Sequence, residues 1–120
     1  MIRVFKGYLI LICVIWILYP LSSLAGMEAE IDHLLAFIDA SDCTFIRNGK
    51  SHENKEAGDH IRRKYGHIKN RVKTTEDFIR YAATKSSMSG QPYQVICNGK
   101  KMATAEWLTR ELHRFRNRNE

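Results

Sequence analysis

The stretch Cys-Thr-Phe-Ile-Arg-Asn-Gly, residues 43–49, decides how this chain is expected to fold. It is rich in β-branched and aromatic residues, and it ends in Asn-Gly, a dipeptide typical of turns. A second run of the same kind, Tyr-Gln-Val-Ile-Cys-Asn-Gly, occupies residues 93–99. We therefore predict strands at 43–47 and 93–97, each followed by a turn.

Each predicted strand carries one cysteine, Cys43 at the start of the first and Cys97 at the end of the second. If the strands pair antiparallel with Phe45 opposite Val95, the two cysteines lie opposite each other. This register predicts a structural disulfide across the ribbon, closing a loop of about 55 residues. A redox-active pair, free thiols and an intermolecular link are the alternatives, and the lack of Cys-x-x-Cys spacing argues against redox activity.

Four helices are predicted around this ribbon from apolar residues at helical spacing. Glu28–Ala40 shows the pattern most clearly, with one apolar stripe at positions 31, 34, 35 and 38. The other three are expected to begin after caps at Ser51 or Asn54, at Thr74 with Asp77 in an approximate capping box, and at Thr104. The second is expected to end or loosen at Gly66, and residues 86–92 to form a loop.

The resulting order is α-β-α-α-β-α, an α+β fold that is mostly helical with a two-stranded antiparallel ribbon. Two strands alone are marginal in water, so the ribbon must lean on the helices. The sequence shows no repeat, low-complexity stretch or Pro-rich linker, which predicts a single small domain over residues 26–120.

Residues 1–25 have the pattern of an export signal. Arg3 and Lys6 precede an uncharged run, Tyr8–Tyr19, and the small residues of Ser23-Leu24-Ala25 stand before the expected cleavage point. We therefore predict a signal peptide and a periplasmic domain. Residues 7–26 carry no charge and are long enough to cross a bilayer, so an uncleaved membrane anchor is the alternative.

The charge balance favours anionic partners. The chain has 19 basic and 13 acidic residues, and removing Arg3 and Lys6 leaves 17 against 13. In an exported protein the anionic candidates are lipid head groups, glycan polymers or acidic proteins, and nucleic acid is not expected. Contact with a membrane is expected only if the signal segment stays attached.

His52, Glu56 and His60 recur at four-residue spacing and would form one stripe on a continuous helix. The two histidines would lie about 12 Å apart along the axis, too far to share one metal ion. A solvated polar face, a ligand or partner site, and a catalytic or metal site are the three readings. The hydrolase, metalloprotease and zinc-finger motifs are absent, and we expect no cofactor and no metal.

Two further segments are polar. Six basic and no acidic residues lie between His60 and Thr75, which is typical of a solvated face and compatible with an anion-binding patch. The Ser-rich loop, residues 86–92, offers hydroxyls and backbone amides to an anion, although such loops more often form a helix end followed by a turn.

Taken together, several of these segments resemble a family of small exported proteins of Gram-negative bacteria that is classed as a domain of unknown function. The resemblance rests on Cys43–Lys50, on the spaced residues of 52–66, on 71–79 and on 86–93, and it covers about Glu30–Phe115. It implies a periplasmic location and a shared fold, and it carries over no catalytic residue.

The same resemblance picks out polar positions that are candidates for binding a ligand or partner: Asn48, His52, Glu56, His60, Arg62, Arg71, Ser86, Ser87 and Ser89. The leading hypothesis is a non-enzymatic binding module for a protein partner or an anionic envelope component. The alternative is a small hydrolase or transferase that uses Glu56 with His52 or His60, with or without a metal.

Overall fold

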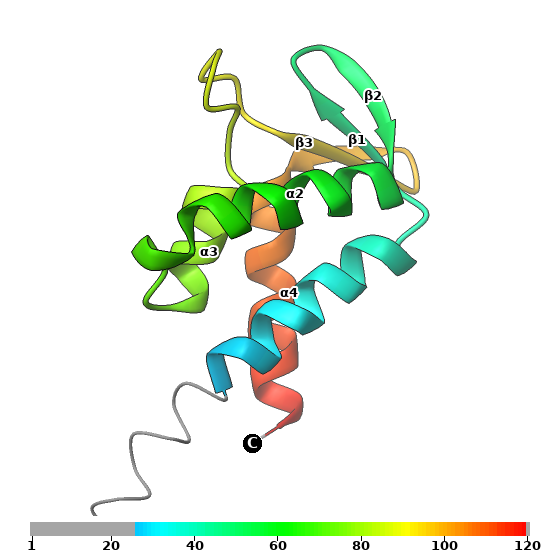
Figure 1. Ribbon diagram of the computed structural model, residues 1–120. Helices are drawn as coiled ribbons and strands as arrows, with labels where there is room; N and C mark the ends of the chain where they lie inside the picture. Colours follow the sequence, from blue (N-terminus) through cyan, green and yellow to red (C-terminus); the bar gives the residue numbers. More distant parts are fainter. Residues whose placement is uncertain (1–25, 120) are drawn as a thin grey trace, which may run out of the picture.

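Two β-hairpins form a four-stranded antiparallel sheet in the computed structural model, which describes residues 26–119 (Figure 1). The first hairpin consists of β1 (Thr44–Arg47) and β2 (Lys50–Glu53), and the second of β3 (Gln94–Cys97) and β4 (Lys100–Ala103). The strand order is β2-β1-β3-β4, so the two hairpins meet along β1 and β3.

The helices lie below the sheet in the view of Figure 1. They are an N-terminal helix at residues 26–40, then α2 (Asn54–Ile68), the short 3₁₀ turn η1 (Lys69–Arg71), α3 (Thr75–Ala82) and α4 (Thr104–Arg118). The predicted α+β class, mostly helical with four helices, is confirmed. The predicted signal peptide, residues 1–25, lies outside the described residues.

Both Asn-Gly dipeptides form the turns that were predicted. Asn48 and Gly49 have φ angles of 53° and 77°, and Asn98 and Gly99 have 51° and 76°. Positive φ at both central positions is the geometry of the tight turn that suits the twist of a hairpin, and Asn-Gly tolerates it best.

The ribbon has four strands and not the two that were predicted. Lys-Ser-His-Glu (50–53) and Lys-Lys-Met-Ala (100–103) lack the β-branched and aromatic residues of a typical strand. They are the edge strands of the sheet. Edge strands avoid pairing with other chains by being short and by carrying lysines. The same two features make these strands hard to recognise in the sequence.

The central strands pair in the predicted register. Phe45 lies opposite Val95 in the antiparallel β1–β3 pair, and Cys43 is bonded to Cys97 with 4.8 Å between their Cα atoms. The predicted structural disulfide is therefore confirmed in this structure. It joins the two hairpins at one end of the β1–β3 pair.

The two hairpins belong to a structural repeat. The second hairpin and its helix begin 50 residues after the first, since Thr44 corresponds to Gln94, Lys50 to Lys100 and Asn54 to Thr104. Phe45 and Val95, which face each other, are also 50 positions apart, so an approximate two-fold axis passes through this pair. The prediction that the chain has no repeat is therefore wrong. The repeat is hard to detect in the sequence, because the two units share little beyond Ile-x-Asn-Gly-Lys at 46–50 and 96–100.

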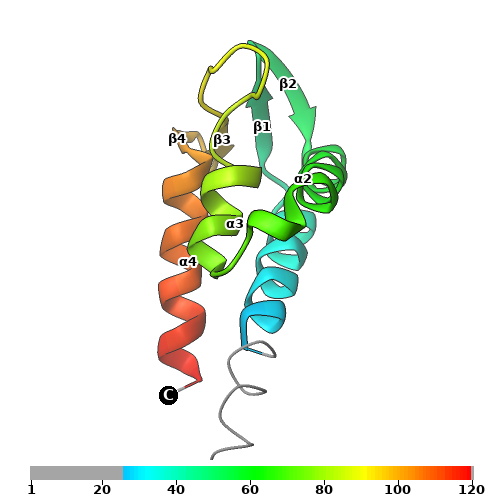
Figure 2. The ribbon, with the colours of Figure 1, turned by 60° about the vertical axis from the view of Figure 1, so that its left-hand side comes forward.

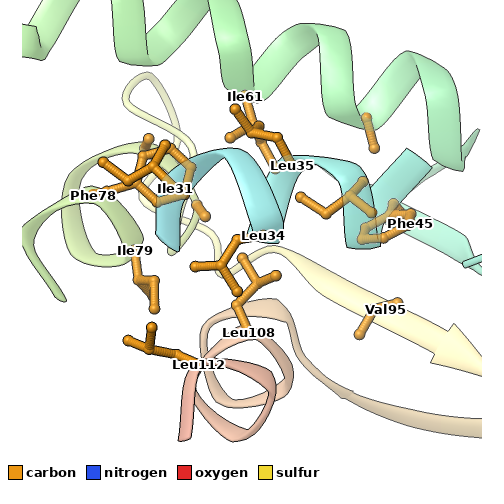
Figure 3. Close-up of a cluster of buried hydrophobic side chains, with 14 of the residues drawn as sticks. Ile31, Leu34, Leu35, Phe45, Ile61, Phe78, Ile79, Val95, Leu108 and Leu112 are labelled. Atoms are coloured by element: carbon orange, nitrogen blue, oxygen red, sulfur yellow. The ribbon is translucent and has the colours of Figure 1, made fainter. Parts of the chain in front are cut away.

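The core forms where the N-terminal helix enters between the repeated units. Figure 3 shows side chains of this helix at the centre, with those of α2, α3, α4, β1 and β3 around them. Leu34 and Ile38 of the N-terminal helix are completely buried, as are Phe78 of α3, Val95 of β3 and Leu108 of α4. Each fully buried side chain of this size stabilises the fold by about 1.5–3 kcal/mol relative to exposure.

Ion pairs and a hydrogen bond hold the N-terminal helix against α2, α3 and α4. Glu30 forms a bidentate pair with Arg116, at 2.6 and 3.1 Å, and accepts a hydrogen bond of 2.6 Å from the buried hydroxyl of Thr75. The Arg116 guanidinium lowers the pKa of Glu30, against the opposing effect of burial. At the other end of the helix, Asp39 pairs with Arg62 across Gly58, where any side chain would collide with the Asp39 carboxylate.

The predicted helix ends are partly right. Thr74 caps α3 with Asp77 in a reciprocal capping box, as predicted. Gly66 neither ends nor loosens α2, which continues to Ile68. Neither Ser51, Asn54 nor Thr104 is a cap, because α2 and α4 follow directly from strands and the cap positions are Glu53 and Ala103.

Removing the disulfide should cost a large part of the stability of this small domain. For a cysteine separation of 54 residues, the chain-entropy model predicts a loss of about 4 kcal/mol in the double variant Cys43→Ser, Cys97→Ser. Guanidinium unfolding of the oxidised protein and the variant measures it. Ser87→Ala, at an exposed loop position, is the control and should leave the unfolding midpoint unchanged. Equal midpoints for oxidised protein and double variant would contradict the prediction.

Candidate functional site

A small cavity lies between the first hairpin, the N-terminal half of α2 and the first residue of α4. We call it the hairpin–helix pocket, and its lining residues are Phe45, Ile46, Arg47, His52, Ala57, His60, Ile61, Tyr93 and Thr104. Its volume is about 20 Å³, room for one small group of the size of a water molecule. Four of the nine lining residues are apolar and five are polar, and the surface of the wall is mostly apolar.

The two repeated units differ in size at one position of the pocket wall. Ala57 on α2 corresponds to Trp107 on α4. Trp107 stacks on Phe37 of the N-terminal helix with 4.5 Å between ring centroids and meets Phe45 of β1 edge-on at 5.6 Å. At the corresponding position of the first unit, the small Ala57 lines the pocket.

The ends of the β1–β3 pair differ in the same way. Cys43 and Cys97 are joined at one end, and the residues 50 positions away from them are Tyr93 and Arg47. Arg47 and Tyr93 both line the hairpin–helix pocket. The β1–β3 pair therefore has a covalent bond at one end and the polar residues Arg47 and Tyr93 at the other.

Thr104 contributes a hydroxyl that has no hydrogen-bond partner among the residues that the structure describes. The residue is 0% exposed, and its Oγ1 is the one buried side-chain oxygen or nitrogen left unpaired in residues 26–119. Its backbone amide is satisfied, donating to the Tyr93 carbonyl at 2.9 Å. Since an unpaired buried hydroxyl costs about 1–3 kcal/mol, a polar group that enters the pocket and pairs with it gains that much.

Tyr93 connects the pocket to α2. Its hydroxyl lies 3.2 Å from Nε2 of His60 and 3.3 Å from Nζ of Lys64, which also donates to the Lys85 carbonyl at 2.6 Å. Burial raises the pKa of the Tyr93 hydroxyl and lowers the pKa of Lys64. The ammonium can only donate, so the Tyr93 oxygen accepts from Lys64, and its proton is directed to the neutral His60 ring.

His60 is held neutral by its surroundings. Burial is the largest cause that lowers its pKa from 6.5 to about 4, followed by the charges of Arg47, Arg63, Lys64 and His52. Every charged group in this set is positive or becomes positive on protonation. The field at the pocket therefore repels cations and favours anions.

His52 has a defined orientation at the pocket wall. Its Nδ1 lies 2.9 Å from Oε1 of Glu56. His52 is on β2, and Glu56 follows four residues later on α2. The His52 side chain is 15% exposed and that of Glu56 is 59% exposed. The pair adds little stability because Glu56 is in water, but it directs Nδ1–H outward and leaves Nε2 as the free acceptor.

Arg47 has no counter-ion in the part of the chain that the structure describes. Its guanidinium enters no ion pair or side-chain hydrogen bond there, and no carboxylate lines the pocket. Arg62, by contrast, is neutralised by Asp39 and Asp59.

The polar positions predicted to form one surface divide into three groups. His52, Glu56 and His60 come together at the pocket, with Glu56 joined through His52. Arg62 faces the N-terminal helix through Asp39, and Arg71 on η1 lies over the ring of Tyr81 at 4.6 Å.

Asn48 and the three serines form the third group, at the tip of the sheet. Ser89 donates a hydrogen bond of 2.5 Å to the side chain of Asn48, so the Ser-rich loop rests on the turn of the first hairpin. Ser86 is buried, and its hydroxyl accepts from the amides of Met88 and Ser89 at 3.3 Å each. These amides, which the sequence offered to an anion, are paired within the loop, and Ser87 is exposed.

Three pocket residues, Arg47, Tyr93 and Thr104, were not among the predicted candidates. Thr104 was interpreted as a cap, and Arg47 and Tyr93 as ordinary strand residues. One signal could have found two of them, because the register that places Cys43 opposite Cys97 also places Arg47 opposite Tyr93. No such signal points to Thr104, because its position at the pocket is set by β4, a strand that was not predicted.

No group of three or more His, Cys, Asp or Glu side chains converges as a set of metal ligands within residues 26–119. None of the helices in that same span is both long enough and apolar enough to cross a bilayer.

With this fold and pocket in view, comparisons with known proteins place the chain in a family. The profile of DUF5329, a family of unknown function, matches residues 25–116, so the chain belongs to that family. A Salmonella typhimurium protein described as the uncharacterized protein YfeK is 44% identical over 70 residues, which are 58% of this chain and 58% of that protein. No solved structure matches the chain. The predicted membership of a family of unknown function is therefore confirmed.

The electrostatics of the pocket can be tested through His60. We expect its imidazole to titrate with a pKa of about 4, and Arg47→Gln to raise that pKa because one repelling charge is removed. Lys50→Gln, at the exposed end of the same hairpin, is the control and should leave it unchanged. Histidine ring resonances followed by NMR against pH measure all three proteins.

The same titration sets a pH dependence of stability. The unfolded chain takes up this proton near pH 6.5 and the folded protein only near pH 4, so the contribution of neutral His60 is complete above about 6.5 and is lost as the pH falls towards 4. A wild-type pKa near 6.5, or one that Arg47→Gln does not change, would contradict this description of the pocket.

Proposed function

We propose that this protein is a non-enzymatic binding module of the periplasm that holds its ligand or partner at the hairpin–helix pocket. The observation that carries the proposal is the buried, unpaired Thr104 hydroxyl at a cavity that is also lined by Arg47, which has no counter-ion among residues 26–119. Buried polar groups are normally paired, and an unpaired one at a concave site is typical of a place where a ligand completes the hydrogen bonding.

The location rests on two lines of support. Residues 1–25 have the pattern of a signal peptide, and the domain holds a disulfide, which persists in oxidising compartments. In this proposal the signal segment is removed and residues 26–120 form one domain. Retention of the segment as an anchor would place the same pocket on a membrane-attached protein.

The rigidity of the site also supports binding. The pocket is framed by the β1–β3 pair, the disulfide at its far end and two helices anchored in the core. A preorganised site of this kind loses little freedom when a ligand enters, which favours affinity. The positive charge of Arg47 in the lining favours a ligand that carries a negatively charged group.

Filling the pocket tests the proposal. Ala57→Leu extends a side chain into the space that the Ala57 methyl leaves, at an expected cost in stability of about 1–3 kcal/mol from overpacking. Wild type and variant, purified from cells expressing the full chain, serve as baits for envelope extract, and mass spectrometry compares the retained proteins and small molecules. We expect Ala57→Leu and the second variant Arg47→Gln to lose what the wild type retains.

The control for this comparison is Arg71→Gln, since Arg71 lies on η1, outside the pocket. It should retain the same molecules as the wild type. If the folded Ala57→Leu and Arg47→Gln proteins also retain them, the pocket is not the binding site and the proposal fails.

A small hydrolase or transferase is the second candidate, favoured by one contact. Glu56 orients His52 at the pocket wall at 2.9 Å, the arrangement of a carboxylate and an imidazole that acts as a base. A volume of about 20 Å³ leaves little room for a substrate and an attacking group together. A hydrolytic activity that Glu56→Gln abolishes would establish this alternative.

A further inference from the structure

We propose that the group received by the hairpin–helix pocket is a carboxylate, whose oxygens accept hydrogen bonds from the Thr104 hydroxyl and the Arg47 guanidinium. This inference rests on the proposed function, because it names the chemistry of the ligand for the same pocket. A carboxylate of this kind is offered by a small free acid or by the C-terminus of a peptide.

The sign of the charge comes from the residues that surround the cavity. Arg47 lines it without a counter-ion in the described part of the chain, and Arg63 and Lys64 follow His60 on α2. No carboxylate of the described residues lines the cavity, since Glu56 contacts only its rim through His52. An anion that enters therefore meets uncompensated positive charge, and a cation is repelled.

The hydrogen-bonding groups select an acceptor. Arginine can only donate, and the Thr104 hydroxyl has its own proton free because its oxygen contacts no partner. A carboxylate has two oxygens that accept in one plane, the shape that a guanidinium binds best. An amine or an alkyl group would leave the Thr104 hydroxyl or the Arg47 guanidinium without a partner.

The size of the cavity limits how much of the anion can enter. About 20 Å³ accommodates a single oxygen atom of the ligand, so the second carboxylate oxygen stays at the opening, whereas a phosphoryl group would leave two further terminal oxygens there. The walls around it, Phe45, Ala57 and Ile61, are all buried, so the space cannot widen without moving the core. The rest of the ligand must then stay outside, towards His52.

Direct titration tests this assignment on protein purified from cells expressing the full chain, with the disulfide formed. The probes are propionate, acetyl-Ala-Ala, inorganic phosphate and propylammonium, and NMR follows the His60 ring and the amides of Arg47 and Thr104. A bound carboxylate offsets the positive charge beside His60, so we expect saturable amide shifts and a rise in the His60 pKa from about 4 with one or both carboxylates. Acetyl-Ala-Ala binding without propionate assigns the source to a peptide C-terminus, and the reverse assigns a free acid.

Variants of Thr104 separate a binding role from a structural one. Thr104→Val removes the hydroxyl at nearly the same volume and should weaken carboxylate binding about tenfold, while the free protein becomes no less stable because an unpaired group is gone. Thr104→Ser keeps the hydroxyl and should restore binding. Arg47→Gln should weaken it further, and Lys101→Gln on the exposed edge strand β4 should have no effect.

The assignment is overturned if the carboxylate shifts do not saturate, if phosphate or propylammonium gives equal shifts, or if Thr104→Val binds as the wild type does. Its failure is distinguishable from that of the proposed function. Loss of extract ligands in Ala57→Leu without carboxylate binding leaves the binding module and removes only the carboxylate. Retention of all extract ligands in Ala57→Leu removes both.

Discussion

The pairing of β1 with β3 is the constraint on which the rest of the structure depends. It joins two hairpin–helix units that are otherwise separate in sequence, with Phe45 opposite Val95 at the centre. The disulfide closes one end of this pair, and the N-terminal helix lies between α2 and α4 in the core (Figure 3). Without this contact each hairpin would be a two-stranded element with little stability in water.

The hairpin–helix pocket follows from an imperfect repetition. The position of Trp107 in one unit is held by the small Ala57 in the other, while a covalent bond at one end of the central strands corresponds to a polar pair at the other. The stabilising crosslink and the cavity therefore lie at opposite ends of the same strand pair. The unpaired Thr104 hydroxyl lies where the second unit contributes to the first.

Much of the fold could be predicted from the sequence, and the limits have physical causes. The helices, the central strands and the disulfide register follow from periodicity and from turn residues. The edge strands were missed because lysines and short length hide them, and the repeat was missed with them. At the pocket, His52, Glu56 and His60 share the start of α2, which spacing along one helix reveals, whereas Arg47, Tyr93 and Thr104 reach it only through strand pairing and the unpredicted second hairpin.

The arrangement of the chain ends has a practical consequence. The start of the N-terminal helix and the last turn of α4 lie at the same end of the molecule, and the sheet lies towards the opposite end, as both ribbon views show (Figures 1 and 2). A link to a resin, a sensor chip or a fusion protein through either terminus would therefore point the sheet away from the support. Immobilisation of this kind leaves the opening beside Arg47 free to meet molecules in solution.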